Sequence, residues 1–234
     1  MPDSILSLTN ISKSFIQRGL VLDNLSMDVR EGDTIAIMGP SGSGKTTLMN
    51  IIGLLDKPDN GSINFRGNDI RSYNEDESAL YRSMNIGFVF QEHLLLPHLT
   101  VLENILLPLL ARKQSREDTE LKETHAASLM RKTGISELGS KYPDTISGGE
   151  AQRAALVRAL VNKPSIILAD EPTGNLDSKT SIDIMGLLDA IHKKGNTVIV
   201  VTHEEDIAKH AARIIRLFDG EIAQDYRNEQ YVKA

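Results

Sequence analysis

Short runs of apolar residues alternate along this chain with longer segments in which apolar residues recur every three or four positions. The apolar runs at 34–38, 86–90, 166–169 and 197–201 are bounded by turn residues and are too short for helices, so each predicts a buried strand. The segment 177–195 has apolar residues at helical spacing, begins with residues typical of helix N-caps and ends on Lys-Lys-Gly, which predicts a helix. Strands that alternate with helices in this way predict an α/β fold with a largely parallel sheet.

The two ends and the middle of the chain differ from this alternation. Residues 1–35 have the looser pattern of strands, and the Asp-Gly pair within 218–222 is a hairpin signal. From residue 92 to 162, helical signals dominate and no convincing strand occurs. We therefore expect one domain, in which a helical subdomain at 92–162 is inserted into an α/β core formed by residues 1–91 and 163–234.

The composition narrows the class of protein. The 234 residues contain no cysteine, which excludes disulfides, thiolate metal sites and a cysteine nucleophile. Acidic residues outnumber basic ones by 32 to 26, and only 5 Phe and 5 Tyr are present, so no nucleic acid is expected as a partner. The apolar stretch at 105–111 is interrupted by Pro108 and is far too short to span a membrane, and the N-terminus lacks the features of a signal peptide. We expect a soluble, cytoplasmic chain.

A phosphate-binding loop follows the predicted strand at 34–38. The residues that match G-x-x-x-x-G-K-[ST], together with the helical residue that follows, are Gly39, Pro40, Ser41, Gly42, Ser43, Gly44, Lys45, Thr46 and Thr47. Glycines let backbone N–H groups approach phosphate oxygens, and the start of the following helix adds to that attraction. We expect Lys45 to reach the β- and γ-phosphates of a nucleoside triphosphate and Thr46 to ligate Mg²⁺. The alternative, a Gly/Ser-rich turn with an incidental lysine, does not account for the strand and helix around it.

Two carboxylates follow the predicted strand at 166–169. Ligands of doubly wound sheets bind outside the carboxyl ends of the strands, so we expect Asp170 and Glu171 to face the phosphate loop. Asp170 suits the holding of Mg²⁺, and Glu171 suits a general base that activates the attacking water. The alternative is a solvated acidic turn.

A second candidate anion site lies between these two elements. Ser147 and Glu150 form the S-x-x-E pattern of a capping box, which predicts the start of a helix. Gly148 and Gly149 leave that helix N-terminus unobstructed and able to receive an anion. The chain's own phosphate loop has no need of a second such site.

In their order, these motifs resemble those of the ATP-binding cassette (ABC) ATPases, whose signature is L-S-G-G-Q. The resemblance covers nearly the whole chain and implies a P-loop NTPase fold of ABC type, with an N-terminal antiparallel β-subdomain beside the mostly parallel sheet. Further family positions are matched by Gln91 (the Q-loop), Asn175, Leu176 and Asp177 (the D-loop), His203 (the switch histidine), and Phe15 and Val21 (contact with ATP). The departures from the family pattern are Ile146 for leucine, Glu150 for glutamine and Phe15 for tyrosine.

The resemblance also implies a mechanism. Two copies would dimerise head to tail around two Mg-ATP, and each copy would offer its signature residues to the γ-phosphate bound by the other copy; these residues are Ser147, Gly148, Gly149 and Glu150. The catalytic residues would be Lys45, Gln91, Glu171 and His203. The metal ligands would be Thr46, Gln91 and Asp170. Asp177 would carry communication between the two sites.

Finer features indicate a branch of the family. One copy of each motif and the short interval between Gln91 and Ser147 favour a transporter subunit over chromosome-maintenance or tandem soluble members. Residues 87–109 and 170–177 are similar to the lipoprotein-releasing and macrolide-exporter (LolD- and MacB-like) group, in which ATP-driven closure moves a separate membrane subunit. The alternatives are the ATPase of another ABC importer or exporter and a non-transport, FtsE-like cell-division ATPase.

The apolar segment 94–110 is the candidate contact with that membrane subunit. It is more hydrophobic than a surface lobe requires, and exposed apolar patches often mark docking sites. The alternative is a buried helix of the helical lobe. We expect an integral membrane partner to contact residues 91–110, so that the chain lies on the cytoplasmic face of the inner membrane.

Overall fold

The computed structural model describes residues 4–111, 116–229 and 231, which form two compact units. The first unit consists of Met1–Ser78 and Ile191–Ala234, and the second is Ala79–Ala190. Two helices begin in one unit and end in the other, namely α2 (Glu75–Asn85) and α6 (Ser178–His192). The chain has an α/β fold with parallel strands and a separate antiparallel sheet, as the sequence predicts.

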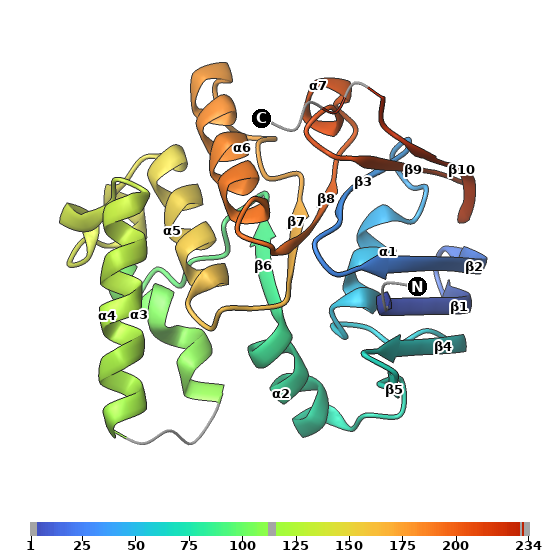
Figure 1. The fold of residues 1–234 in the computed structure, drawn as a ribbon, viewed down its shortest axis with the longest axis horizontal. Helices are drawn as coiled ribbons and strands as arrows, with labels where there is room; N and C mark the ends of the chain where they lie inside the picture. The colour runs from blue at the N-terminus through green and yellow to red at the C-terminus, as the bar shows by residue number, and fades with distance from the viewer. Residues whose placement is uncertain (1–3, 112–115, 230, 232–234) are drawn as a thin grey trace. The chain divides into compact units, whose positions relative to one another are not determined.

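The first unit contains the antiparallel sheet, whose strands lie in the order β2-β1-β4-β5 (Figure 1). Their bounds are β1 (Ser4–Phe15), β2 (Gly19–Arg30), β4 (Asn60–Phe65) and β5 (Asn68–Asp69). Leu6 and Leu8 of β1 are buried and pair in register with Phe65 and Ile63 of β4. These apolar cross-strand pairs explain why the looser alternation at the start of the sequence folds as a sheet.

The first unit also contains four strands in the order β10-β9-β3-β8. A short helix follows β3, and another connects β8 to β9. These elements are β3 (Thr34–Met38), α1 (Lys45–Ile52), β8 (Thr197–Val201), α7 (Glu205–Ala208), β9 (Arg213–Phe218) and β10 (Glu221–Arg227). All residues of β3 and β8 are buried, and the two strands are parallel, with Ile37 paired to Val201. The segments that leave the carboxyl ends of β3 and β8 therefore start at the same edge of the sheet.

The second unit combines a parallel pair of strands with a group of helices. Its elements are β6 (Ile86–Phe90), α3 (Val101–Leu106), the 3₁₀ helices η1 (Leu107–Ala111), η2 (Ser136–Leu138) and η3 (Pro143–Thr145), α4 (Arg116–Lys132), α5 (Gly148–Leu160) and β7 (Ile166–Asp170). The predicted helical subdomain, 92–162, lies within this unit. The unit extends beyond 92–162 because it also includes β6 and β7, which pair with each other. Helix α5 packs on β6, since a Cβ on Gly87 would lie only 2.4 Å from the Ala159 carbonyl oxygen.

The apolar segment 94–110 is divided between a core and a surface. Val101, Ile105 and Leu109 are buried in the core of the helices, where they pack with residues of α4 and α5. Leu94 and Leu96 are about half exposed, at 52% and 49% of their surface. Part of this segment is therefore a lobe core, and part is open to a partner. Within the described part of the chain, no helix combines the length and hydrophobicity that a bilayer span requires.

Candidate functional site

The loop between β3 and α1 has a backbone that requires glycine. Gly39, Gly42 and Gly44 have φ of 153°, 84° and 100°, and Gly44 is the left-handed N-cap of α1. A Cβ on Gly39 would lie 2.3 Å from the carbonyl oxygen of Leu217, and a Cβ on Gly44 would lie 2.6 Å from Leu22 Cδ2. The glycines of the predicted phosphate loop therefore let the chain pass between β9 and β2.

The polar groups of this loop fit a bound phosphate. Lys45 is buried, with 8% of its surface exposed, and its Nζ donates to the carbonyl oxygens of Gly39 and Pro40 at 2.8 Å each. The Ser43 hydroxyl is buried and has no hydrogen-bond partner among the described residues, none of which caps the N-terminus of α1 with its side chain. A donor that is buried without a partner is costly unless a ligand satisfies it, so these residues suit the phosphates of a nucleotide.

Two other predicted residues of the first unit, His203 and Val21, lie on segments next to this loop. His203 follows β8, is exposed, and leaves the same sheet edge as Gly39, because the Thr202 N–H donates to the Ile37 carbonyl at 3.1 Å. The Val21 carbonyl oxygen would lie 2.9 Å from a Cβ on Gly44.

Phe15, at the end of β1, is half-buried beneath a cation. The Lys13 Nζ lies 5.2 Å from the centroid of the Phe15 ring and forms a 2.7 Å ion pair with Asp56. The ion pair holds the ammonium group over one face of the ring.

The second unit places the predicted Q-loop beside the predicted D-loop. β6 and β7 are parallel with Phe90 paired to Asp170, so the residues after them leave the same edge. The Gln91 Nε2 donates to the Asn175 Oδ1 at 3.4 Å, and a Cβ on Gly174 would lie 2.8 Å from that nitrogen. The chain turns at Glu171, which has a φ of 43°, and the Gly174 N–H donates to the Glu171 carbonyl at 3.0 Å.

The helix start at Ser147 is a complete capping box, as predicted. The Glu150 N–H donates to the Ser147 Oγ at 3.4 Å, while the Ser147 N–H and hydroxyl each donate to the Glu150 Oε2 at 2.8 Å. The Ser147 backbone and side-chain bonds hold the pKa of the Glu150 carboxyl below its ordinary value. The start of α5, where Ser147 and Gly148 are exposed, therefore carries a carboxylate of its own.

Asp177, in the predicted D-loop, caps α6 and lies beside the predicted signature motif. Its Oδ2 accepts from the Thr180 hydroxyl at 2.6 Å, and its Oδ1 accepts from the N–H groups of Thr180 and Lys179 at 3.1 Å each. The hydrogen bonds from the Thr180 side chain and backbone lower the pKa of the Asp177 carboxyl. A Cβ on Gly149 would lie only 2.5 Å from Thr180 Cγ2, so the starts of α5 and α6 are in close contact.

The residues predicted for the nucleotide site thus fall into two groups, one on each unit. The first unit carries the phosphate loop with Thr46, and the second carries Gln91, Asp170 and Glu171. Hydroxyl, amide and carboxylate oxygens are the kinds of ligand that Mg²⁺ accepts, so Thr46, Gln91 and Asp170 fit that ion chemically. Their meeting around one nucleotide stays a prediction.

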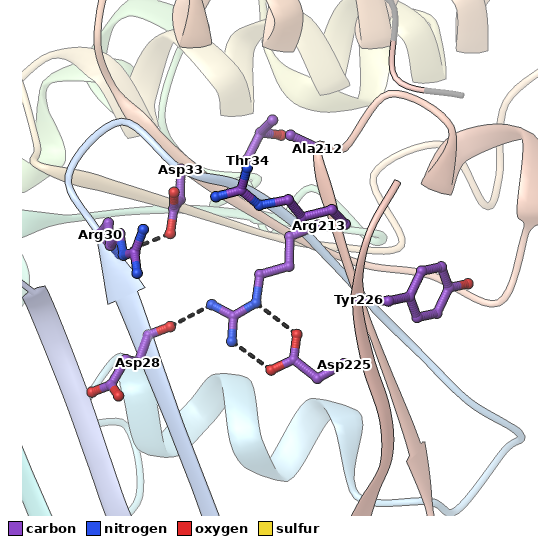
Figure 2. Close-up of a pocket in the computed structure, with 9 residues that line it drawn as sticks. Asp28, Arg30, Asp33, Thr34, Ala212, Arg213, Asp225 and Tyr226 are labelled. Carbon is purple, nitrogen blue, oxygen red and sulfur yellow. Dashed lines mark hydrogen bonds and ion pairs between the residues drawn. The ribbon is translucent and has the colours of Figure 1, made fainter. Parts of the chain in front are cut away.

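A pocket of about 490 Å³ lies elsewhere in the first unit (Figure 2). Arg213 forms two hydrogen bonds with Asp225, at 2.5 and 2.7 Å, and donates to the Asp28 carbonyl at 2.6 Å. The bond to Asp225 raises the pKa of the Arg213 guanidinium. The pocket includes Thr34, at the opposite end of β3 from the phosphate loop, so it is separate from the predicted nucleotide site.

Sequence reasoning missed a polar link at the Q-loop, where we expected His93 to be a loop or surface residue. His93 Nδ1 is hydrogen-bonded to the Gln152 Oε1, and Gln152 is completely buried. The signal in the sequence is a single glutamine among the apolar residues of α5, whose neighbours Ala151, Ala154 and Ala155 are buried.

Comparisons with known proteins identify the family of this chain. The family model described as ABC transporter matches residues 22–174. The chain is 42% identical to the lipoprotein-releasing system ATP-binding protein LolD of Geobacter metallireducens, over 95% of this chain and 99% of that protein. It is 46% identical to the macrolide export ATP-binding/permease protein MacB of Bdellovibrio bacteriovorus, over 88% of this chain but only 31% of MacB.

A solved structure is similar as well. The dimeric post-hydrolysis state of the ATP-binding cassette MJ0796, bound to ADP and phosphate, has a TM-score of 0.84 and 39% identity over 95% of this chain and 98% of that one. The family match extends over more than half of the chain and includes the phosphate loop and the acidic pair. The chain therefore belongs to the ABC transporter family, as an ATP-binding cassette that hydrolyses ATP.

Proposed function

We propose that two copies of this chain close head to tail around two Mg-ATP and thereby drive a separate membrane subunit of the LolD/MacB type, in lipoprotein release or export. The observation that carries the proposal is the start of α5, where Ser147 and Gly148 are exposed at a helix N-terminus that suits an anion. A second copy supplies the anion for that position. The dimeric cassette with ADP and phosphate and the similarity to LolD and MacB support this arrangement.

The chemistry is hydrolysis of the terminal phosphoanhydride. Lys45, the Ser43 hydroxyl and the N–H groups of the loop bind the phosphates, and His203 contacts the γ-phosphate. When bound by Thr46, Gln91 and Asp170, Mg²⁺ neutralises part of the phosphate charge.

Glu171 is the general base in this proposal. The water oxygen bonds to the γ-phosphorus while the bond to the bridging oxygen breaks, and the Glu171 carboxylate takes the water's proton.

The capping box has a role in closure. The Ser147 hydroxyl donates to Glu150 in the free chain, so it has to turn away from that carboxylate in order to donate to the partner's γ-phosphate. The Ser147 N–H can keep its 2.8 Å bond to Glu150 during this change. Because the γ-phosphate is the anion that links the helix start of one copy to the phosphate loop of the other, closure is expected to weaken when that phosphate leaves.

The Glu171→Gln substitution tests the enzymatic part. Removing the base while keeping the side-chain shape is expected to abolish turnover and to stabilise an ATP-bound dimer, measured by phosphate release and by light scattering with ATP. Glu221→Gln, at an exposed position on β10, is the matched control. Normal hydrolysis by Glu171→Gln would remove Glu171 from the base role.

The membrane subunit is proposed to contact residues 91–110. Within that range Leu94 and Leu96 are exposed, and buried Asn104 fixes their loop, since it donates to the carbonyl of Leu96 at 3.0 Å and accepts from the Leu96 N–H at 2.6 Å. A rigid loop with two apolar side chains suits the docking of a short amphipathic segment. This contact would hold the chain on the cytoplasmic face of the membrane.

Charged substitutions test the contact. Leu96→Glu is expected to retain ATP binding but to lose an integral membrane protein that co-purifies with the tagged chain from native membranes. Leu121→Glu on α4, where the leucine is 65% exposed, is the control. Unchanged assembly and unchanged ATPase stimulation with Leu96→Glu would count against this surface. The identity of the co-purified protein separates a LolD/MacB-type transporter from another ABC transporter or from an FtsE-like division complex.

A further inference from the structure

A buried carboxamide joins two catalytic segments of the second unit. Gln152 on α5 is fully buried, its Nε2 donates to the Pro172 carbonyl at 2.7 Å, and its Oε1 faces His93 Nδ1. Pro172 directly follows Glu171, and His93 lies two residues after Gln91. One side chain therefore connects the turn after the predicted base with the Q-loop.

The orientation of the Gln152 carboxamide is determined by its two partners. A carbonyl oxygen accepts only, so the amide nitrogen of Gln152 must point at Pro172 and its oxygen must point at His93. His93 then carries a hydrogen on Nδ1, and this N–H donates a hydrogen bond to the Gln152 Oε1. Burying an amide is costly unless its bonds are made, so either broken bond leaves a buried polar group unpaired.

The Q-loop turn is strained, and α5 holds it in place. His93 and Leu94 have φ of 61° and 47°, which are unfavourable for residues with a Cβ. Arg158, on the same helix as Gln152, donates to the carbonyl oxygens of both, at 2.6 and 2.5 Å. Burial lowers the pKa of this guanidinium. Strain of this kind persists only where surrounding groups determine the conformation, which here are Arg158 and Gln152.

The same turn reaches the signature motif. His93 Nε2 lies 3.9 Å from the point where a Cβ on Gly148 would be, next to the start of α5. A rotation of the His93 ring would therefore change its contact with Gly148 and its hydrogen bond to Gln152, which in turn binds the carbonyl of Pro172.

We propose that His93 and Gln152 are positioning residues that lock the Q-loop turn to the backbone that follows the catalytic carboxylate. This inference rests on the role of Glu171 in the proposed function. With the link made, the turn after Glu171 is held at one distance from the Q-loop, and a displacement of the Q-loop moves Glu171 with it. Neither residue touches the reacting atoms, so their loss acts on turnover rather than on nucleotide binding.

The test uses variants of His93 that differ only in the donor. His93→Asn keeps an N–H group near the position of Nδ1, whereas His93→Leu has a similar size and no donor. We expect His93→Leu to lower the ATPase kcat about tenfold, the usual scale for one lost hydrogen bond expressed in a rate. His93→Asn should retain most of the kcat, and both should leave the KM for ATP within about twofold. His192→Leu is the control, because His192 is also half-buried and its Nδ1 lies 3.3 Å from the Asn196 carbonyl oxygen.

Variants of Gln152 complete the design. Gln152→Glu keeps an acceptor for His93 but places an oxygen against the Pro172 carbonyl, and it should lower kcat as Gln152→Leu does. In the double variant of His93→Leu and Gln152→Leu, kcat should be no lower than in the worse single variant, since both changes break one link. If the Gln152 variants unfold, the His93 pair alone decides.

Equal kcat in the Leu and Asn variants of His93, multiplicative losses in the double variant, or a raised KM with unchanged kcat would each overturn the link. Glu171→Gln, assayed in parallel, separates the two proposals. Normal turnover by that variant removes the base assignment, whereas an inactive Glu171→Gln beside a fully active His93→Leu removes only the link.

Discussion

A methyl group added to the second signature glycine is expected to destabilise the chain before any partner is present. The Cβ of Gly149→Ala would lie 2.5 Å from Thr180 Cγ2, about 1 Å closer than ordinary contact. Thr180 cannot turn away freely, because its hydroxyl is bound to the Asp177 Oδ2 at 2.6 Å and is part of the cap of α6. Overpacking of this kind costs about 1–3 kcal/mol, and replacing glycine in a helix returns at most about 1 kcal/mol. With that return in full, a net loss of up to about 2 kcal/mol follows.

Urea unfolding of the nucleotide-free chain, followed by circular dichroism, measures this loss. Gly148→Ala is the matched control, since its Cβ would meet nothing closer than Leu176 Cδ2 at 3.7 Å. That variant should be as stable as the parent or slightly more so. Both variants should lose ATPase activity, because each obstructs the helix start offered to the partner's phosphate.

A second substitution tests the cause. Thr180→Ser removes Cγ2 but keeps the hydroxyl that binds Asp177, and the next nearest atoms, Oγ1 and Cβ, lie at 3.5 and 3.6 Å from the new methyl group. In the Gly149→Ala background it should restore most of the lost stability. Equal stability of the two alanine variants, or no recovery with Thr180→Ser, would refute the steric argument.

Two further predictions concern the phosphate loop and the capping box. Ser43→Ala should not lower, and is expected to raise, the unfolding free energy of the nucleotide-free chain, because it removes a buried hydroxyl that has no partner among the described residues, while the Kd for ATP measured by calorimetry rises about tenfold. An unchanged Kd would show that this hydroxyl does not bind phosphate. Glu150 has a lowered pKa in the folded chain, so its contribution to stability is present above pH 4.5, the ordinary carboxyl value, and is lost as the pH falls through the folded value. Glu150→Gln should therefore lose less stability than the parent on acidification in a pH series of urea unfolding curves, and parallel curves would contradict the assignment.

Local patterns predicted the strands and the helix starts because each depends on a few neighbouring residues. The runs at 34–38, 86–90 and 197–201 are strands with those same bounds, and Ser147 with Glu150 forms the predicted cap. These elements can be predicted from the spacing of neighbouring residues alone, without information on distant contacts.

Features that depend on distant contacts were not predictable in this way. The pattern of segment 94–110 does not tell which leucines α4 and α5 cover, so the division into core and surface required the structure. The partners of Gln152 are 59 residues before it and 20 residues after it, and no local rule connects them. The polar link at the Q-loop was missed for that reason.

The discontinuity of the first unit has a consequence for the order in which the chain folds. The second unit is one continuous segment, whereas the first needs Ile191–Ala234 to complete it. β3 lies between β8 and β9, which are synthesised long after β3, and the loop at Gly39 packs against the Leu217 carbonyl of β9. A ribosome-bound chain that ends before residue 217 therefore has its phosphate-binding sequence but not the strand that shapes it. The ability to bind ATP is expected to arise only after β9 has been added to the growing chain.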